Sequence, residues 1–403
     1  FFVFAMSKFE SFSDELKFSS SSVATAKRYD SAEDVEELIA AIKKDLKAVC
    51  FSGNTYSEEA CASIAKALAE CEDLEYADCS DMFTTRLKTA VPPALKLLCD
   101  AFEKTSIASL DVSDNALGGP GTACVVDLLS KNSFTTLRIN NCGIGTAGAL
   151  VLANTFRNLS GVESISLKDA KHEDLKEILE DDQTPAFTTE SRCEIPLQVL
   201  VVGRNRLKVD GAEALSYGLC HLKNLKEFHA ASNSIPPEGL IAICHSLQSC
   251  TELEVLDLND NSLKAEGVPE LVALLEKLPH LRRLNVGDCS LEAEGSLELL
   301  KALERVAPKL EFLDMTYNEI DNEGGEIIIR LLQSRENLSS LELNGSCFSG
   351  STIKKLEKAM EEAGHPDGLG SMSDNEDEED EEDEEEDDDE VDTLTSGVSK
   401  LSV

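Results

Sequence analysis

One phrase of eleven residues recurs along the chain and constrains its fold more strongly than any other feature. It places apolar residues at positions one, four, six and eleven and Asn, Cys or Ser at position nine, as in Leu253–Leu263 (LEVLDLNDNSL). The ninth, or ladder, position advances in steps of 28, 28, 28, 29 and 28 residues through Asn205, Asn233, Asn261, Cys289, Asn318 and Ser346. A period this regular means that each unit is one structural element stacked on its neighbours.

The phrase predicts a short strand followed by a turn. Alternating apolar residues bury one face of a strand, and the ladder Asn can satisfy backbone groups at the turn, in its own and the next repeat. Each unit continues with apolar residues at helical spacing, for example Leu271, Leu274, Leu275 and Leu278. We therefore predict an α/β leucine-rich-repeat solenoid, a ribonuclease-inhibitor-like arc with a concave parallel sheet and convex helices.

The repeat also divides the chain. We expect residues 1–30 to form an N-terminal extension and residues 31–363 to form about ten repeats. From Cys142 to Asn205 the ladder position advances by 63 residues, more than two periods, which predicts an inserted surface loop near 168–196. Residues 364–403 are expected to be a disordered acidic tail, because a run of Asp and Glu repels itself and has no apolar area to bury.

The charge balance excludes one class of partner. The chain has 77 acidic and 37 basic residues, a net charge of -40, and only -16 of it comes from residues 374–403. The remainder is therefore acidic too, which repels nucleic acid and favours a basic protein partner. The 13 Cys follow the repeat rather than a disulfide framework, and no apolar run is long enough to span a membrane, so we expect an intracellular, reduced protein.

No motif for catalysis, metal binding or phosphate binding stands out in the sequence. It has no zinc spacing, no P-loop and no GxGxxG that opens a helix after a strand. The Cys residues at ladder positions are expected to be core, and a lone His on a repeat helix is expected to be a surface or packing residue. The default expectation is a binding protein that is not itself an enzyme and carries no cofactor or metal.

Three segments depart from the bland polar positions of the repeat. Ser80–Leu95 (SDMFTTRLKTAVPPAL) breaks the phrase where a regular strand and turn should be, and its Pro92-Pro93 fits a helix start. In LRINNCG, Asn140 and Asn141 precede the ladder residue Cys142, so both are expected to face solvent. In GRNRL, Arg204 and Arg206 flank the ladder residue Asn205 and form a basic spot on an acidic protein.

Each of these segments also has an ordinary interpretation as solvated surface. All three follow strands, however, so they should lie along one rim of the arc. That shared location favours a partner site.

These segments, together with the acidic tail, resemble the leucine-rich-repeat family of GTPase-activating proteins for the nuclear-transport GTPase Ran. The similarity covers most of residues 30–390. SDMFTTRLKTAVPPAL looks like that family's characteristic loop, and LRINNCGIG, VVGRNRL and LDLNDN follow in the family's order. Two details differ: Thr85 stands where the family's loop often has Gly, and 168–196 is longer than usual.

The resemblance implies an activator, because GTP, magnesium and the glutamine that orients the attacking water belong to the GTPase. The family's key asparagine matches Asn141, which would position that glutamine. Its loop arginine matches Arg86, which would hold the interface and the loop. The implied partner-binding residues are Asp81, Lys88, Asn140, Arg204 and Arg206.

On this interpretation the protein is a monomer in the cytoplasm or at the nuclear envelope. It binds GTP-bound Ran, with Ran-binding proteins as further partners, and supports nucleocytoplasmic transport. The alternative is a passive leucine-rich-repeat scaffold or inhibitor whose acidity binds a basic protein. The irregular loop at 80–95 favours the first interpretation, since a pure scaffold has no need of it.

Overall fold

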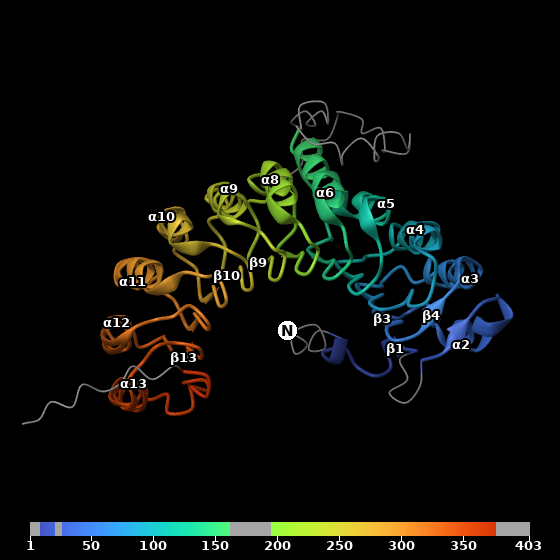
Figure 1. Cartoon of the computed structure of the whole chain (residues 1–403). Coiled ribbons are helices and arrows are strands. Elements are labelled where there is room, and N and C mark those ends of the chain that lie inside the picture. Colours follow the sequence, from blue (N-terminus) through green and yellow to red (C-terminus); the bar gives the residue numbers. More distant parts are fainter. Residues whose placement is uncertain (1–8, 21–25, 162–194, 376–403) are drawn as a thin grey trace, which may run out of the picture.

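A single parallel sheet lines the inner side of an arc, and helices cover its outer side (Figure 1). The computed structural model describes residues 9–20, 26–161 and 195–375. Within these ranges the sheet has eleven strands in the order β1-β3-β5-β6-β7-β8-β9-β10-β11-β12-β13. Apart from the short strands β2 and β4, which lie in the sequence between β1 and β3 and between β3 and β5, the strands of the sheet are neighbours in the order of the chain, as a solenoid requires.

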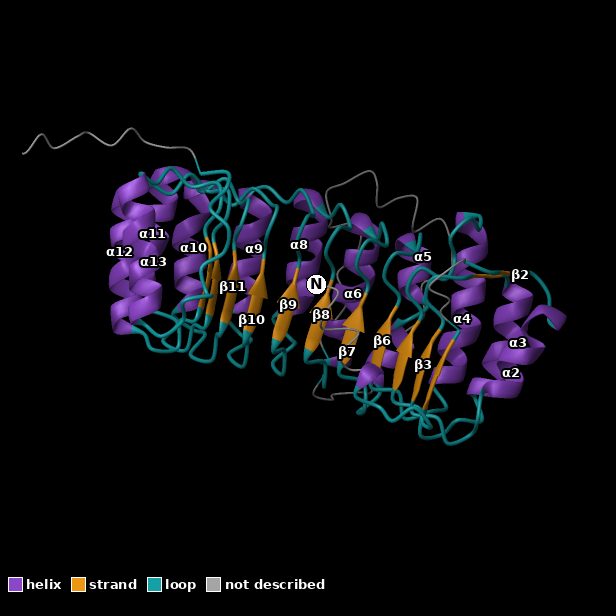
Figure 2. Ribbon diagram, turned by 90° about the horizontal axis from the view of Figure 1, so that it is seen from below, coloured by secondary structure: helices purple, strands orange, loops and turns teal. Residues whose placement is uncertain are grey.

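The strands are three residues long, and the central residue of each is buried except in β1, where Phe18 is half-buried. Their bounds are β1 (Lys17–Ser19), β3 (Ala48–Cys50), β5 (Tyr76–Asp78), β6 (Ser109–Asp111), β7 (Thr136–Arg138), β8 (Val199–Val201), β9 (Glu227–His229), β10 (Val255–Asp257), β11 (Arg283–Asn285), β12 (Phe312–Asp314) and β13 (Ser340–Glu342). A separate two-stranded sheet pairs β2 (Arg28–Tyr29) with β4 (Thr55–Tyr56). Figure 2 shows the main sheet with its strands side by side and pointing the same way.

Helices return the chain across the convex side. They are α2 (Glu36–Ala41), α3 (Glu58–Leu68), α4 (Val91–Phe102), α5 (Gly118–Ala123), α6 (Gly145–Leu159), α8 (Lys208–Leu219), α9 (Pro237–Leu247), α10 (Lys264–Leu275), α11 (Glu292–Leu303), α12 (Asn322–Ser334) and α13 (Gly350–Glu362), with short 3-10 segments η1 (Glu33–Val35), η2 (Lys88–Ala90) and η3 (Val126–Ser130). Leu271, Leu274, Leu275 and Leu278 are all buried, which confirms the helical spacing read from the sequence.

The ladder residues are buried and hold adjacent repeats together. Asn205 accepts a hydrogen bond from the backbone N–H of Cys142 at 2.9 Å and donates to the carbonyls of Ile139 and Val202 at 2.7 and 2.9 Å. The side-chain amide thus joins its own repeat to the preceding repeat. From the sequence we expected it to join the following repeat instead. Every buried backbone group at the turn needs such a partner, which explains the regularity of the ladder.

The solenoid includes residues that the sequence placed outside it. Strand β1 lies within the expected N-terminal extension 1–30 and pairs with β3. At the other end, Leu369 bridges Leu341, and Asn375 accepts a hydrogen bond from the N–H of Phe348 at 3.0 Å. Asn375 thus takes a ladder position one period after Ser346. Both additions cover a sheet end whose backbone groups would otherwise lack partners.

The expected insertion does not interrupt the sheet. Residues 162–194 lie outside the described part of the chain, and so do the irregular repeat near Val162 and the acidic run after Asn375. Strand β7 nevertheless pairs directly with β8, with Leu137 opposite Leu200. The segments LRINNCG and GRNRL are therefore neighbours in the structure, although they are far apart in the sequence.

The described cysteines form no disulfides, and most are buried. The ladder residues Cys142 and Cys289 are core residues, as predicted. Burial raises the pKa of both thiols, which keeps them protonated. No helix in the described ranges is both long and apolar enough to cross a membrane.

Candidate functional site

The turns that follow the strands form one edge of the solenoid, which we call the rim. Three residues after the end of its strand, each of four neighbouring repeats places a residue with positive φ on this edge: Asp81 (45°), Asp114 (59°), Asn141 (52°) and Arg204 (55°). These residues follow β5, β6, β7 and β8, which are consecutive in the sheet. Since adjacent strands lie about 4.8 Å apart, the four positions span roughly 15 Å.

Asn141 is exposed on the rim, and its amide has a fixed direction. Its Nδ2 donates to Oδ1 of Asp114 at 2.8 Å, and its backbone N–H donates to the carbonyl of Gly203 at 2.9 Å. A carboxylate accepts hydrogen bonds but does not donate them, so Asp114 requires the nitrogen side of the amide. Among the described residues nothing bonds to Oδ1 of Asn141, which leaves a hydrogen-bond acceptor directed away from Asp114.

Asn140 differs from its neighbour, although both were expected to face solvent. It is half-buried, and its backbone N–H donates to Oγ of Ser113 at 3.1 Å. Its side chain lies over the next repeat, because a Cβ added at Gly203 would be only 2.5 Å from Oδ1 of Asn140. The expectation was thus wrong for Asn140, whose side chain packs between repeats.

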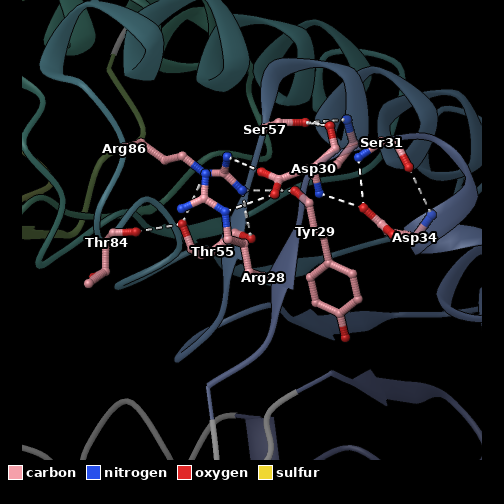
Figure 3. A network of polar contacts seen from close by, with 10 residues as sticks. Arg28, Tyr29, Asp30, Ser31, Asp34, Thr55, Ser57, Thr84 and Arg86 are labelled. Atoms are coloured by element: carbon pink, nitrogen blue, oxygen red, sulfur yellow. Dashed lines mark hydrogen bonds and ion pairs between the residues drawn. The ribbon is translucent and has the colours of Figure 1, made fainter.

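The side chain of Arg86 is hydrogen-bonded to residues of β2 and β4 and to Asp30, which follows β2 (Figure 3). Its guanidinium forms an ion pair with Asp30 and donates to the carbonyls of Tyr29 and Thr55 at 2.9 and 3.2 Å, and its Nε donates to Oγ1 of Thr55 at 3.1 Å. Only 10% of the side chain is exposed. Hydrogen bonds from Arg28 and Arg86 hold the pKa of Asp30 below its ordinary value. Arg86 therefore fastens residues 80–90, here called the rim loop, to β2 and β4.

The rim loop replaces a regular turn. Met82 is buried near the ladder position of this repeat, and Oδ1 of Asn115 accepts hydrogen bonds from the N–H groups of Met82 and Phe83, both at 3.1 Å. Asp81 is half-buried and accepts a hydrogen bond from the hydroxyl of Thr84. Thr85 has a φ of 68°, a strained conformation for a β-branched residue.

The basic residues of the three segments lie on the surface. Lys88 is exposed in η2, and its side chain passes over Gly118 at the start of α5. Arg204 and Arg206 are exposed on either side of buried Asn205, and both have a φ of 55°. The structure therefore brings all three predicted segments to one rim, with Arg204 in the turn next to the turn that holds Asn141.

Sequence reasoning missed two residues of this site. Asp114, which fixes Asn141, stands directly before ladder residue Asn115, as Asn141 stands directly before Cys142. Comparing equivalent positions between repeats would have found it. Asp30 carries no such signal, because it lies 56 residues before Arg86 and outside the expected repeat domain.

A second group of polar residues lies on the concave face. A hollow of about 250 Å³ is lined by residues of β7 and β9–β12, among them Arg138, Arg283 and Phe312. Within it, Nδ1 of His229 lies 3.3 Å from Asp257 and Nε2 lies 3.4 Å from Glu227. Burial alone would lower the pKa of His229, but these two carboxylates outweigh it and raise the pKa above its ordinary value.

Comparison with known proteins identifies the repeat and the family. A family model described as leucine-rich repeat matches residues 130–153, 249–272, 277–299 and 306–328. The chain is 43% identical to Ran GTPase-activating protein 1 of Xenopus laevis, over 86% of this chain and 57% of that protein. It is 36% identical to the Ran GTPase-activating protein of Drosophila melanogaster, over 83% and 53% of the two chains.

A third relative, Ran GTPase-activating protein 2 of Caenorhabditis elegans, is 34% identical over 51% of this chain and 19% of its own length. The matched part of the chain thus spans little more than half of the first two relatives and less of the third. The repeat phrase, the arc and these similarities agree. The chain belongs to the leucine-rich-repeat family of Ran GTPase-activating proteins.

Proposed function

We propose that this protein stimulates GTP hydrolysis by a Ran-like small GTPase. The names of its relatives support this activity, and the observation that carries it is the oriented amide of Asn141 on the rim. GTP, magnesium and the hydrolytic residues belong to the partner. The protein thereby keeps the cytoplasmic pool of the GTPase bound to GDP and supports nucleocytoplasmic transport.

The mechanism rests on hydrogen bonding between Asn141 and the GTPase glutamine that orients water. Because Asp114 takes the nitrogen side of the Asn141 amide, Oδ1 is left to accept from the glutamine NH₂. That bond restricts the glutamine to the rotamer in which it holds the attacking water. A fixed group needs no reorganisation when the reaction occurs, and the contact strengthens as the two proteins exclude water.

Arg86 has a structural role in this proposal. An arginine finger must reach the transferred phosphoryl group, but the guanidinium of Arg86 already contacts Asp30, Tyr29 and Thr55. Its contribution is to hold the rim loop, with Asp81 and Lys88, against the switch region of the GTPase. The exposed guanidinium groups of Arg204 and Arg206 supply further contacts on the other side of Asn141.

The test is single-turnover hydrolysis by GTP-loaded Ran with increasing amounts of the protein. Replacing Asn141 with Ala or Gly should lower the maximal stimulated rate at least about a hundredfold, the size of effect seen when one positioned polar group is removed from an active site. Gly is the better variant, because it accepts the φ of 52° without strain. Complex formation should survive. Stimulation equal to that of the parent chain would exclude this role for Asn141.

Arg86→Ala should instead weaken both binding and stimulation, because the rim loop loses its attachment to β2 and β4. A passive scaffold for a basic protein is the competing function, and the acidity of the chain, with 77 acidic against 37 basic residues, favours it. Substoichiometric amounts of the protein distinguish the activator from the scaffold, since a scaffold cannot release phosphate from a molar excess of GTP-loaded Ran.

We further propose that the protein acts as a cytoplasmic monomer, with Ran-binding proteins as additional partners.

A further inference from the structure

Leu87 is the most exposed large hydrophobic residue in the described part of the chain. Its exposed fraction is 76%, against 51% for Tyr217 and 50% for Tyr317. We propose that Leu87 is the apolar contact by which the rim loop binds the GTP-bound GTPase, and that it sets affinity rather than turnover. This inference rests on the proposed function and adds to it a residue that does not act on the glutamine.

The backbone on both sides of Leu87 is fixed. Thr85 holds its strained φ of 68°, and Arg86 is bonded to β2 and β4. The carbonyl of Leu87 accepts a hydrogen bond from Ala90 at 2.8 Å. The side chain of Lys88 lies against Gly118, where an added Cβ would come within 3.2 Å of its Cε. Leu87 is thus held between two basic residues that are each in contact with the body of the protein.

An exposed leucine by itself means little, because single apolar residues are common on protein surfaces. Leu87 differs in that its loop contains a strained residue and a half-buried arginine. Strain of this kind persists only where the surrounding contacts impose it, and it is concentrated at functional sites. A loop that served only to stay soluble would need neither the strain nor an apolar side chain at its most exposed point.

Leu87 lies close enough to Asn141 along the rim for one GTPase to contact both residues. Asp81 of the rim loop follows β5, and Asn141 holds the same position after β7, so the two lie two strands or about 10 Å apart along the rim. Lys88, the neighbour of Leu87, reaches Gly118 in the repeat between them. A typical interface buries about 800 Å² on each partner, a patch of roughly 16 Å radius. A GTPase that contacts Asn141 through such a patch therefore also covers the rim loop. Because the backbone around Leu87 is already fixed, binding costs little backbone conformational entropy.

The experiment separates affinity from turnover. Single-turnover hydrolysis by GTP-loaded Ran is measured at increasing concentrations of the protein. Leu87→Ala should raise the half-saturating concentration about tenfold and leave the maximal rate within twofold of the parent, as expected for an apolar interface contact. Leu87→Asp should raise the half-saturating concentration further, and Leu87→Met should restore it.

Tyr217→Ala is the matched control, because Tyr217 is the next most exposed large hydrophobic residue but lies on α8. It should change neither parameter, and thermal unfolding should confirm that all variants are folded. The inference is overturned if Leu87→Asp has the half-saturating concentration of the parent, or if it lowers only the maximal rate. If the parent does not stimulate hydrolysis, the proposed function fails. Calorimetric titration with Ran bound to a non-hydrolysable GTP analogue then decides the role of Leu87 by itself, and a parent that does not bind overturns it.

Discussion

The repeats from β9 to β13 and those from β5 to β8 have the same architecture but differ in what they leave exposed. In the first group each turn follows the phrase, the ladder residues are buried, and α9–α13 are 11 to 13 residues long. In the second group the rim loop replaces a turn, α5 shortens to 6 residues, and α6 lengthens to 15. The comparison suggests a division of roles: the regular repeats stabilise the arc, and we propose that the irregular repeats carry the groups that bind the GTPase.

The comparison is sharpest for two asparagines in opposite roles, Asn261 and Asn141. Asn261 is buried, accepts hydrogen bonds from the N–H groups of Asn233 and Ile235, and donates to the carbonyls of Ala230 and Leu258. Asn261→Ala should cost about 3 to 4 kcal/mol in urea unfolding, because several buried backbone groups lose their partner. Stimulation by the remaining folded protein should be normal. Asn141→Gly should instead leave the stability in urea nearly unchanged and lower the stimulated rate. If the two variants change stability and stimulation alike, the two asparagines do not have separate roles.

Asp114 tests whether the direction of the Asn141 amide matters. In Asp114→Asn the new side chain can present either its nitrogen or its oxygen, so Asn141 is no longer restricted to one orientation. We expect the maximal stimulated rate to fall about tenfold, roughly 1.4 kcal/mol, with little change in affinity. Asp260→Asn is the control, since Asp260 holds the same rim position with a φ of 53° in a regular repeat. Equal rates for the two variants would show that the Asp114 contact is incidental.

Thr85 tests whether the irregular region stores strain. Glycine adopts a φ of 68° freely, so Thr85→Gly should stabilise the protein by up to about 1 kcal/mol despite the added flexibility of the unfolded chain. Thr89→Gly makes the same chemical change at an exposed residue of η2 and should destabilise instead. Both are measured by urea unfolding. If the two variants shift the transition in the same direction, strain at Thr85 is not significant.

His229 gives the smallest expected effect and tests the regular region. Its pKa is raised in the folded protein, so its stabilising contribution is fully present below the unfolded value of about 6.5 and is lost as the pH rises through the folded pKa. His229→Gln should therefore lower the melting temperature by roughly 2 °C at pH 5.5 and by less at pH 8.5. If the difference in melting temperature between His229→Gln and the parent grows with pH, the ion pairs of His229 with Glu227 and Asp257 do not stabilise the protein.

The sequence was informative wherever structure depends on neighbouring residues. Strand, turn and helix repeat within each unit, so the ladder positions could be predicted one by one. The contacts of Arg86 could not, because β2 and β4 contribute two residues each and carry no readable pattern. The contact between Asn140 and Gly203 could not be predicted either. These two residues come together only because β7 pairs with β8, and 60 residues of sequence separate those strands. Asp114 could have been predicted from the sequence, because it occupies the same position in its repeat as Asn141 does in the next one.

The hydrogen bonds of Asn375 decide where the acidic run can be removed without harm. Asn375 bonds to both the N–H and the carbonyl of Phe348, and Asp374 accepts from the hydroxyl of Tyr317 and the amide of Asn344. A truncation at residue 370 would delete these contacts together with the charge and would expose the final repeat. A stop codon placed directly after Asn375 removes the fifteen consecutive acids from Glu376 to Glu390 and leaves the closing contacts of the solenoid in place.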